Sequence, residues 1–135
     1  MMNVTFENSF IVMPADCNYQ HGPNGAMMIF GGAFMSQLDL CAASCVNQLL
    51  LGTECDSAVT YKVLDGTFHL ACESGDIVFM KATVVELRRN AIVVHVTAER
   101  QRRTDPKRER AADFRFVFVS KRAGQVHPHG LAFPI

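Results

Sequence analysis

The longest run of hydrophobic positions in the chain, residues 30–51, predicts a single long helix. The run opens on the pair Gly31-Gly32, contains no proline, and is followed by Gly52, a residue type that commonly ends helices. Its one charged residue is Asp39. Because such a helix is apolar nearly all round, the pattern predicts that it is buried at the centre of the domain rather than half exposed.

Alternating hydrophobic and polar positions predict β-strands before and after this helix. Residues 4–12 form the first expected strand, and residues 15–26, rich in Asn, Gly, His and Pro, are expected to form a loop that leads to the helix start. Beyond the helix, four strands are expected at residues 58–71 (with a bulge at Asp65-Gly66), 77–87, 91–100 and 111–121.

Tight turns join these later strands, including one at Gly75-Asp76, so neighbouring strands should be antiparallel. One face of the sheet must then cover the apolar helix. We therefore predict one α+β domain over residues 1–121, a curved antiparallel β-sheet wrapped around one long central α-helix, with a C-terminal tail at residues 122–135. The sheet edges and the other face stay partly uncovered, which favours a homodimer.

Composition narrows the classes of partner. Of the 135 residues, 49% are hydrophobic and 19% are charged, which excludes a disordered chain. Lys and Arg together number 13, as do Asp and Glu, so the net charge gives no reason to expect nucleic acid or a membrane. Five cysteines without a Cys-x-x-Cys pair, and no signal-like N-terminus, favour a cytoplasmic protein. No acidic or histidine cluster shares a ligand spacing with them, so no metal site is expected.

Two features of the long helix indicate a catalytic site: the single acid Asp39 and the glycine pair Gly31-Gly32 at the helix start. At about 100° per residue, Asp39 falls outside the arc of polar side chains and among apolar ones. A carboxylate there is costly unless it is paired or used, so the position suits a general base. Free N–H groups at Gly31 and Gly32 could hold a carbonyl oxygen as it becomes an oxyanion. The alternative is purely structural: the glycines only turn or pack, and the acid is satisfied locally.

Three motifs precede or lie within this helix and a fourth follows it: Met13-Pro14-Ala15-Asp16-Cys17-Asn18, Ile29-Phe30-Gly31-Gly32, Met35-Ser36-Gln37-Leu38-Asp39 and Gly75-Asp76-Ile77-Val78. Together with Phe68 and the patterns at residues 88–99 and 114–119, they resemble bacterial acyl-CoA thioesterases of the hotdog-fold superfamily. The resemblance covers about residues 10–120, and the Phe-Gly-Gly…Gln-x-Asp element is its most specific part.

The resemblance implies a hotdog fold and hydrolysis of an acyl-CoA thioester at a homodimer interface, often within a hexamer built as a trimer of dimers. It implies Asp39 as general base or nucleophile, and Asn18 as the residue that helps place the thioester or the water. Backbone N–H groups around Phe30, Gly31 and Gly32 would polarise the thioester carbonyl. CoA is then part of the substrate, and no separate cofactor is expected.

Two departures from the family pattern leave alternatives open. The segment between Asn18 and the helix is longer than in the pattern, so Asn24 could take the role of the asparagine. The turn Arg88-Arg89-Asn90 lacks the small hydroxyl residue often found near the CoA phosphates in relatives, and its arginines or Asn90 are expected to compensate. The basic segment at residues 100–110 is expected to be a solvated hairpin in preference to a phosphate site.

Two other functions fit the same fold. A hydroxyacyl dehydratase pairs a loop histidine with a helix acid, and His21 with Asp39 could imitate that pair. A non-enzymatic acyl-CoA binding module is the second alternative, since a fold does not fix a function. The spacing Gly-Gly-x-x-Met-x-Gln-x-Asp favours the thioesterase over both.

Overall fold

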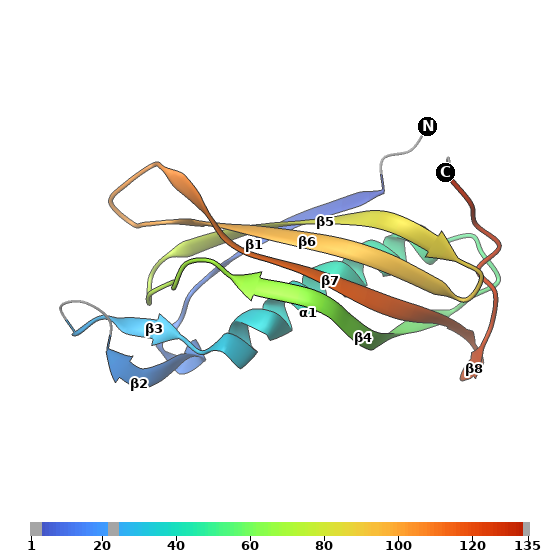
Figure 1. The fold of residues 1–135 in the computed structure, drawn as a ribbon, viewed down its shortest axis with the longest axis horizontal. Helices are drawn as coiled ribbons and strands as arrows, with labels where there is room; N and C mark the ends of the chain where they lie inside the picture. The colour runs from blue at the N-terminus through green and yellow to red at the C-terminus, as the bar shows by residue number, and fades with distance from the viewer. Residues whose placement is uncertain (1–3, 22–24, 134–135) are drawn as a thin grey trace.

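Helix α1 spans Gly31–Leu50 in the computed structural model of the protein, which describes residues 4–21 and 25–133. An antiparallel sheet with the strand order β1-β5-β6-β7-β4 curves along the helix (Figure 1). Its strands are β1 (Thr5–Ile11), β4 (Ser57–Phe68), β5 (Ile77–Arg88), β6 (Ala91–Gln101) and β7 (Arg108–Arg122), and β8 (Gln125–Val126) pairs with β7. The prediction of one long helix wrapped by a curved antiparallel sheet is confirmed.

The core forms between one face of α1 and the inner face of the sheet. The alternation read from the sequence places every second side chain of β5, β6 and β7 against the helix. On the helix, the fully buried side chains recur at helical spacing: Phe34, Leu38, Cys41, Ala42, Cys45 and Val46. The prediction that the helix is buried all round is wrong for the single chain, because a sheet covers one side only. Leu40, on the uncovered side, is 56% exposed.

The segment predicted as a loop forms regular structure. The short 3₁₀ helix η1 (Pro14–Asp16) overlaps its start, and strand β2 (Cys17–His21) lies within it and pairs with β3 (Met27–Ile29), which directly follows it. The turn-forming residues seen in the sequence lie in the middle of this segment, and the flanking residues are free to pair as a hairpin. The Phe30 N–H donates to the Asp16 carbonyl at 2.8 Å, which fixes the hairpin to the start of α1.

Strand β4 is continuous, as predicted, but its irregularities lie elsewhere. The pairing with β7 shifts at Tyr61 and at Leu64, each an extra residue on the β4 side, rather than at Asp65-Gly66. Gly66 has a packing role instead, because a Cβ there would overlap the ring of Phe114. The strand also ends at Phe68 and does not continue to residue 71.

The predicted basic tip is shorter and more ordered than expected. Strand β7 begins at Arg108, so only residues 102–107 connect it to β6. Arg102 donates to the buried carboxylate of Asp76 at 3.1 Å and also pairs with Glu73, and the Arg100 side chain is largely buried. A solvated hairpin is therefore the wrong description for these two arginines. Strands β6 and β7 extend beyond the residues that the hydrophobic pattern predicts. Their ends in this region consist of charged and polar residues, so no alternation of apolar positions marks them in the sequence.

The described part of the tail follows, after β8, the end of the sheet where β5 turns into β6 (Figure 1). In the described part of the chain, no helix combines the length and hydropathy that crossing a membrane requires.

Candidate functional site

The acid of the helix lies in a hollow between α1 and the edge strand β4. The Thr60 hydroxyl, on β4, donates a hydrogen bond to Asp39 Oδ1 at 2.7 Å. The hollow has a volume of about 360 Å³ and is lined by Gly32, Met35, Ser36, Asp39, Thr60, Val63 and Phe116. Asp39 is half-buried there and not enclosed, which corrects the expectation of a fully buried acid. Among the described residues, Thr60 is the one hydrogen-bond donor found for this carboxylate, so its second oxygen can accept another bond.

The start of α1 leaves backbone donors open beside this hollow. The first helical bond runs from the Phe34 N–H to the Phe30 carbonyl at 3.0 Å, and no described side chain caps the helix. The N–H groups of Gly31, Gly32 and Ala33 therefore have no partner within the helix. A Cβ on Gly32 would collide with the ring of Phe30, so glycine at this position lets that exposed ring fold back over the helix start.

A second, apolar hollow of about 300 Å³ adjoins the same helix start on the side of Gly31. It is lined by Ile29, Gly31, Phe34, Phe68, His69, Leu70 and Ala71. The rings of Phe34 and Phe68 pack at 5.4 Å between centroids and form part of its wall. The helix start thus lies between a hollow that contains an acid and a hollow lined mainly by apolar groups.

Of the two candidate asparagines, the structure describes only Asn18. Asn18 lies on β2, next to Cys17, which pairs with Ile29 just before the helix start. Asn24 lies outside the described residues, as does the side chain of His21, so the alternative asparagine and the dehydratase pair stay predictions.

The predicted phosphate-binding turn lies at the other end of the molecule. Arg88, Arg89 and Asn90 connect β5 to β6 near the C-terminal end of α1, away from Gly31 and Gly32 (Figure 1). The Arg88 and Arg89 side chains are exposed, and Arg88 pairs with Glu86. The amide oxygen of Asn90 is buried without a partner among the described residues. A single chain therefore does not bring this turn to the helix start.

Family comparison decides the class of protein. Residues 27–107, more than half of the chain, match the model of the thioesterase superfamily. The chain belongs to the thioesterase superfamily. A search of curated proteins found no match.

Solved structures place this superfamily member in the hotdog fold. It is 25% identical to a hexameric thioesterase from Yersinia pestis, with a TM-score of 0.79 over 93% of this chain and 94% of that one. An acyl-CoA hydrolase from Staphylococcus aureus, in complex with butyryl-CoA, CoA and CoA disulfide, is 23% identical, with a TM-score of 0.79 over 94% and 71% of the two chains. An acyl-CoA hydrolase from Bacillus cereus is 20% identical, with a TM-score of 0.77 over 93% and 71%.

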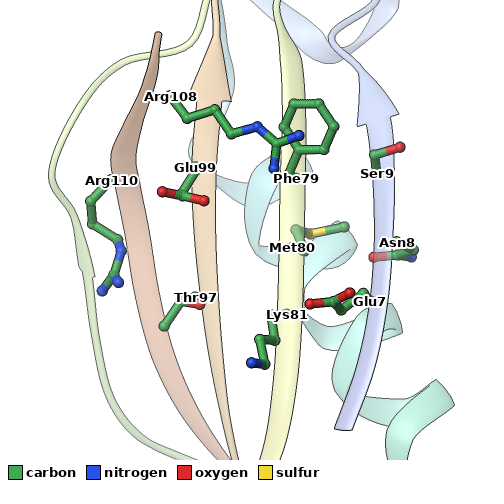
Figure 2. A pocket seen from close by; sticks show the side chains of 10 residues that line it. All are labelled: Glu7, Asn8, Ser9, Phe79, Met80, Lys81, Thr97, Glu99, Arg108 and Arg110. Carbon is green, nitrogen blue, oxygen red and sulfur yellow. The ribbon is translucent and has the colours of Figure 1, made fainter.

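Outside the helix site, another hollow of this thioesterase-superfamily chain, about 420 Å³ in volume, lies on the outer face of the sheet. Figure 2 shows the Arg108 guanidinium across the ring of Phe79, 3.5 Å from its centroid, with Glu99 and Arg110 beside it. The hollow is wide and lined by solvated charges of both signs, and it contains none of the predicted site residues. We therefore do not place the chemistry there.

The outer face also carries an acid with two histidines. Asp113 on β7 lies 2.6 Å from His69 Nε2 and 3.6 Å from His95 Nε2. The hydrogen bond from His69, reinforced by that from His95, lowers the pKa of the Asp113 carboxyl. Among the described residues, no three His, Cys, Asp or Glu side chains could together hold a metal ion.

All five cysteines of this superfamily member are free thiols. Burial raises the pKa of Cys41 and Cys72 to about 12, and that of Cys45 to about 11. Burial and the charge of Asp16 also raise the pKa of Cys17. Cys55 lies in the core, where its thiol contacts the carbonyl of His127 at 3.4 Å.

Proposed function

We propose that the protein hydrolyses acyl-CoA thioesters to free CoA and a carboxylic acid. The observation that carries the proposal is the pairing of Asp39 with Thr60 in a hollow between α1 and the edge strand β4. Membership of the thioesterase superfamily supports the reaction class, and similar folds carry acyl-CoA hydrolases.

In this proposal Asp39 acts as the general base. Thr60 holds Oδ1, so Oδ2 takes a proton from a water while that water attacks the thioester carbonyl carbon. The carbonyl oxygen becomes an oxyanion that accepts hydrogen bonds from N–H groups at a helix start. The C–S bond then breaks, and the CoA thiolate receives the proton. Because a thiolate is a good leaving group, a general base and an oxyanion-binding site are sufficient for this reaction.

The acid and the donors come from two copies of the chain in this proposal. Within one helix, the seven residues from Gly32 to Asp39 span about 10 Å along the axis. One thioester carbonyl group therefore cannot contact the N–H of Gly32 and the carboxylate of Asp39 in the same chain. An antiparallel second copy, seated on the exposed side of α1 and β4, would bring its helix start toward Asp39, and Asn18 on the adjoining hairpin would accompany it. The functional unit is then a homodimer, which can assemble further, as in the hexameric relative from Yersinia pestis.

CoA carries its phosphates far from its thioester, at the other end of the pantetheine arm. A site in which Asp39 lies far from Arg88 and Arg89 has room for the pantetheine arm between the thioester and the phosphates. We assign the phosphates to Arg88 and Arg89, whose guanidinium groups suit phosphate geometry. Asn90 contributes by shaping the turn between them and β6.

The test is thiol release from a panel of short, long and aromatic acyl-CoAs by the wild type and by Asp39→Asn, with CoA binding measured on both. We expect a loss of about two orders of magnitude or more in the variant, with binding kept. Asp65→Asn, an exposed acid-to-amide change on β4, is the matched control and should keep full activity. Tight binding of acyl-CoA without release by the wild type would refute the proposal and indicate a binding module.

A single turnover in ¹⁸O-labelled water separates the two possible roles of the acid. A general base puts the label into the released carboxylic acid at once. If Asp39 is instead the nucleophile, it forms a mixed anhydride with the acyl group as the CoA thiolate leaves, and water that attacks the Asp39 carbonyl of this anhydride leaves the label in the Asp39 carboxylate.

A further inference from the structure

The C-terminal segment crosses the end of the sheet where β5 turns into β6 (Figure 1). It is bound there through its backbone: Ser120 Oγ donates to the His127 carbonyl at 2.7 Å, and the His127 N–H donates to the Ser120 carbonyl at 3.0 Å. The segment is therefore a fixed neighbour of residues 88–91, although the sequence shows only a tail with proline and histidine.

One side chain of this segment, His129, is buried against the turn. It is 4% exposed, and both ring nitrogens are used. Nε2 contacts the carbonyls of Arg88 and of Ala91, the latter at 3.3 Å, while Nδ1 accepts the N–H of Leu131 at 3.0 Å. Because both partners of Nε2 are acceptors and Nδ1 accepts a hydrogen bond, the ring proton is assigned to Nε2.

His129 and Ser120 together bind every backbone carbonyl of the turn. The backbone N–H of His129 donates to the Arg89 carbonyl at 3.4 Å, and the Ser120 N–H donates to the Asn90 carbonyl at 3.0 Å. Together with the ring contacts, these bonds hold the carbonyls of four consecutive residues, 88–91. A two-residue turn at a sheet end is ordinarily among the most mobile parts of a domain. Here the backbone of the turn is held by hydrogen bonds from the C-terminal segment and from Ser120, and the side chains of Arg88 and Arg89 stay exposed to solvent.

We propose that His129 is a positioning residue for CoA binding: by fixing the turn at residues 88–91, it presents Arg88 and Arg89 to the phosphates. The inference rests on the proposed function. Preorganised donors lose less entropy on binding, which raises affinity without a new contact. The exposed pair of Arg88 with Glu86 does not oppose this, because exposed ion pairs are weak and a phosphate can displace the carboxylate.

The test compares two substrates with the same acyl group, one on CoA and one on N-acetylcysteamine, which lacks the phosphates. In His129→Phe we expect the KM for acyl-CoA to rise about tenfold, the effect of weakening one charged hydrogen bond, with kcat unchanged. Hydrolysis of the N-acetylcysteamine thioester should be unaffected. His129→Gln keeps a donor and an acceptor and should restore most of the affinity.

His127→Gln is the matched control, because the His127 ring pairs with exposed Glu54 and not with the turn. It should behave as wild type on both substrates. In the background of Arg88→Gln with Arg89→Gln, His129→Phe should have no further effect on the KM for acyl-CoA.

Three results would overturn the inference. Equal losses on both substrates would show that His129 only supports the fold, and an unchanged KM in every variant would show that the turn needs no support. If the wild type hydrolyses neither substrate, the proposed function fails, and calorimetry with CoA then decides the inference alone. Equal CoA affinity in wild type and His129→Phe would refute it, and a tenfold loss would support it.

Discussion

At the scale of single residues, the site depends on one hydrogen bond between two elements. Thr60 donates to Asp39 Oδ1 and thereby fixes the rotation of the carboxylate. The hydrophobic pattern was enough to predict Asp39, because an acid stands out on an apolar helix. It could not predict Thr60, which is one of many strand threonines. Its contact depends on how α1 lies on β4, and the bulge at Tyr61 adjusts that placement.

Replacing Thr60 by the isosteric valine should lower kcat about tenfold, because the carboxylate loses a hydrogen bond of the charged kind and rotates freely. Thr60→Ser keeps the hydroxyl and should retain most of the activity. Thiol release under saturating acyl-CoA measures both. Equal activity in the valine and serine variants would show that the hydroxyl is dispensable.

At the scale of elements, polar side chains on the outer face of the sheet connect neighbouring strands through hydrogen bonds and ion pairs. Asp113 on β7 contacts His95 on β6 and His69 just beyond β4, so one carboxylate joins three neighbouring segments. Strand positions could be read from the sequence because hydrophobic alternation marks them. The contacts of Asp113 and the hairpin of β2 and β3 could not be predicted from the sequence. In a sequence, polar residues that bind one another cannot be distinguished from polar residues that face water.

This network predicts an acid-dependent part of the stability. Hydrogen bonds from the histidines lower the folded pKa of Asp113, so its stabilising effect is complete above the unfolded value near pH 4 and is lost as the pH falls below it. Asp113→Asn should lower the free energy of unfolding at pH 7 by up to about 1 kcal/mol, because the site is partly solvated. Urea unfolding at pH 7 and pH 3 measures this. The variant should lose less stability than wild type between the two values, and an equal loss would contradict the assignment.

At the scale of the whole molecule, one side of the chain is an uncovered apolar strip. Strand β4 is one of the two edges of the sheet. Large hydrophobic side chains are exposed along it and on the adjoining helix: Val59, Tyr61, Val63, Leu64, Phe68 and Leu40. A long edge of this kind invites pairing with a second chain. The proposed homodimer would also account for the hydrophobic pattern of the helix, because the single chain covers only one side of α1 and a second copy would cover the other.

Two valines of equal exposure test this interpretation. Val59 on β4 is 45% exposed, and Val85 on the outer part of β5 is 46% exposed. Val59→Lys should convert the dimer into a folded monomer and reduce acyl-CoA hydrolysis at least tenfold, because a buried lysine charge is costly at an interface. Val85→Lys should change neither property. Sedimentation velocity and thiol release measure both, and a monomeric wild type would refute the dimer.

The protonation of the cysteines matters for the proposed reaction, because a thioester substrate would meet the thiols of the chain. A thioester can pass its acyl group to any thiolate within reach, which would leave the enzyme acylated by its own substrate. Three thiols, Cys41, Cys45 and Cys72, are kept protonated inside the core by burial, and a neutral thiol is a poor nucleophile. The sulfur-rich core therefore stays inert toward the acyl groups that the surface hollow is proposed to process.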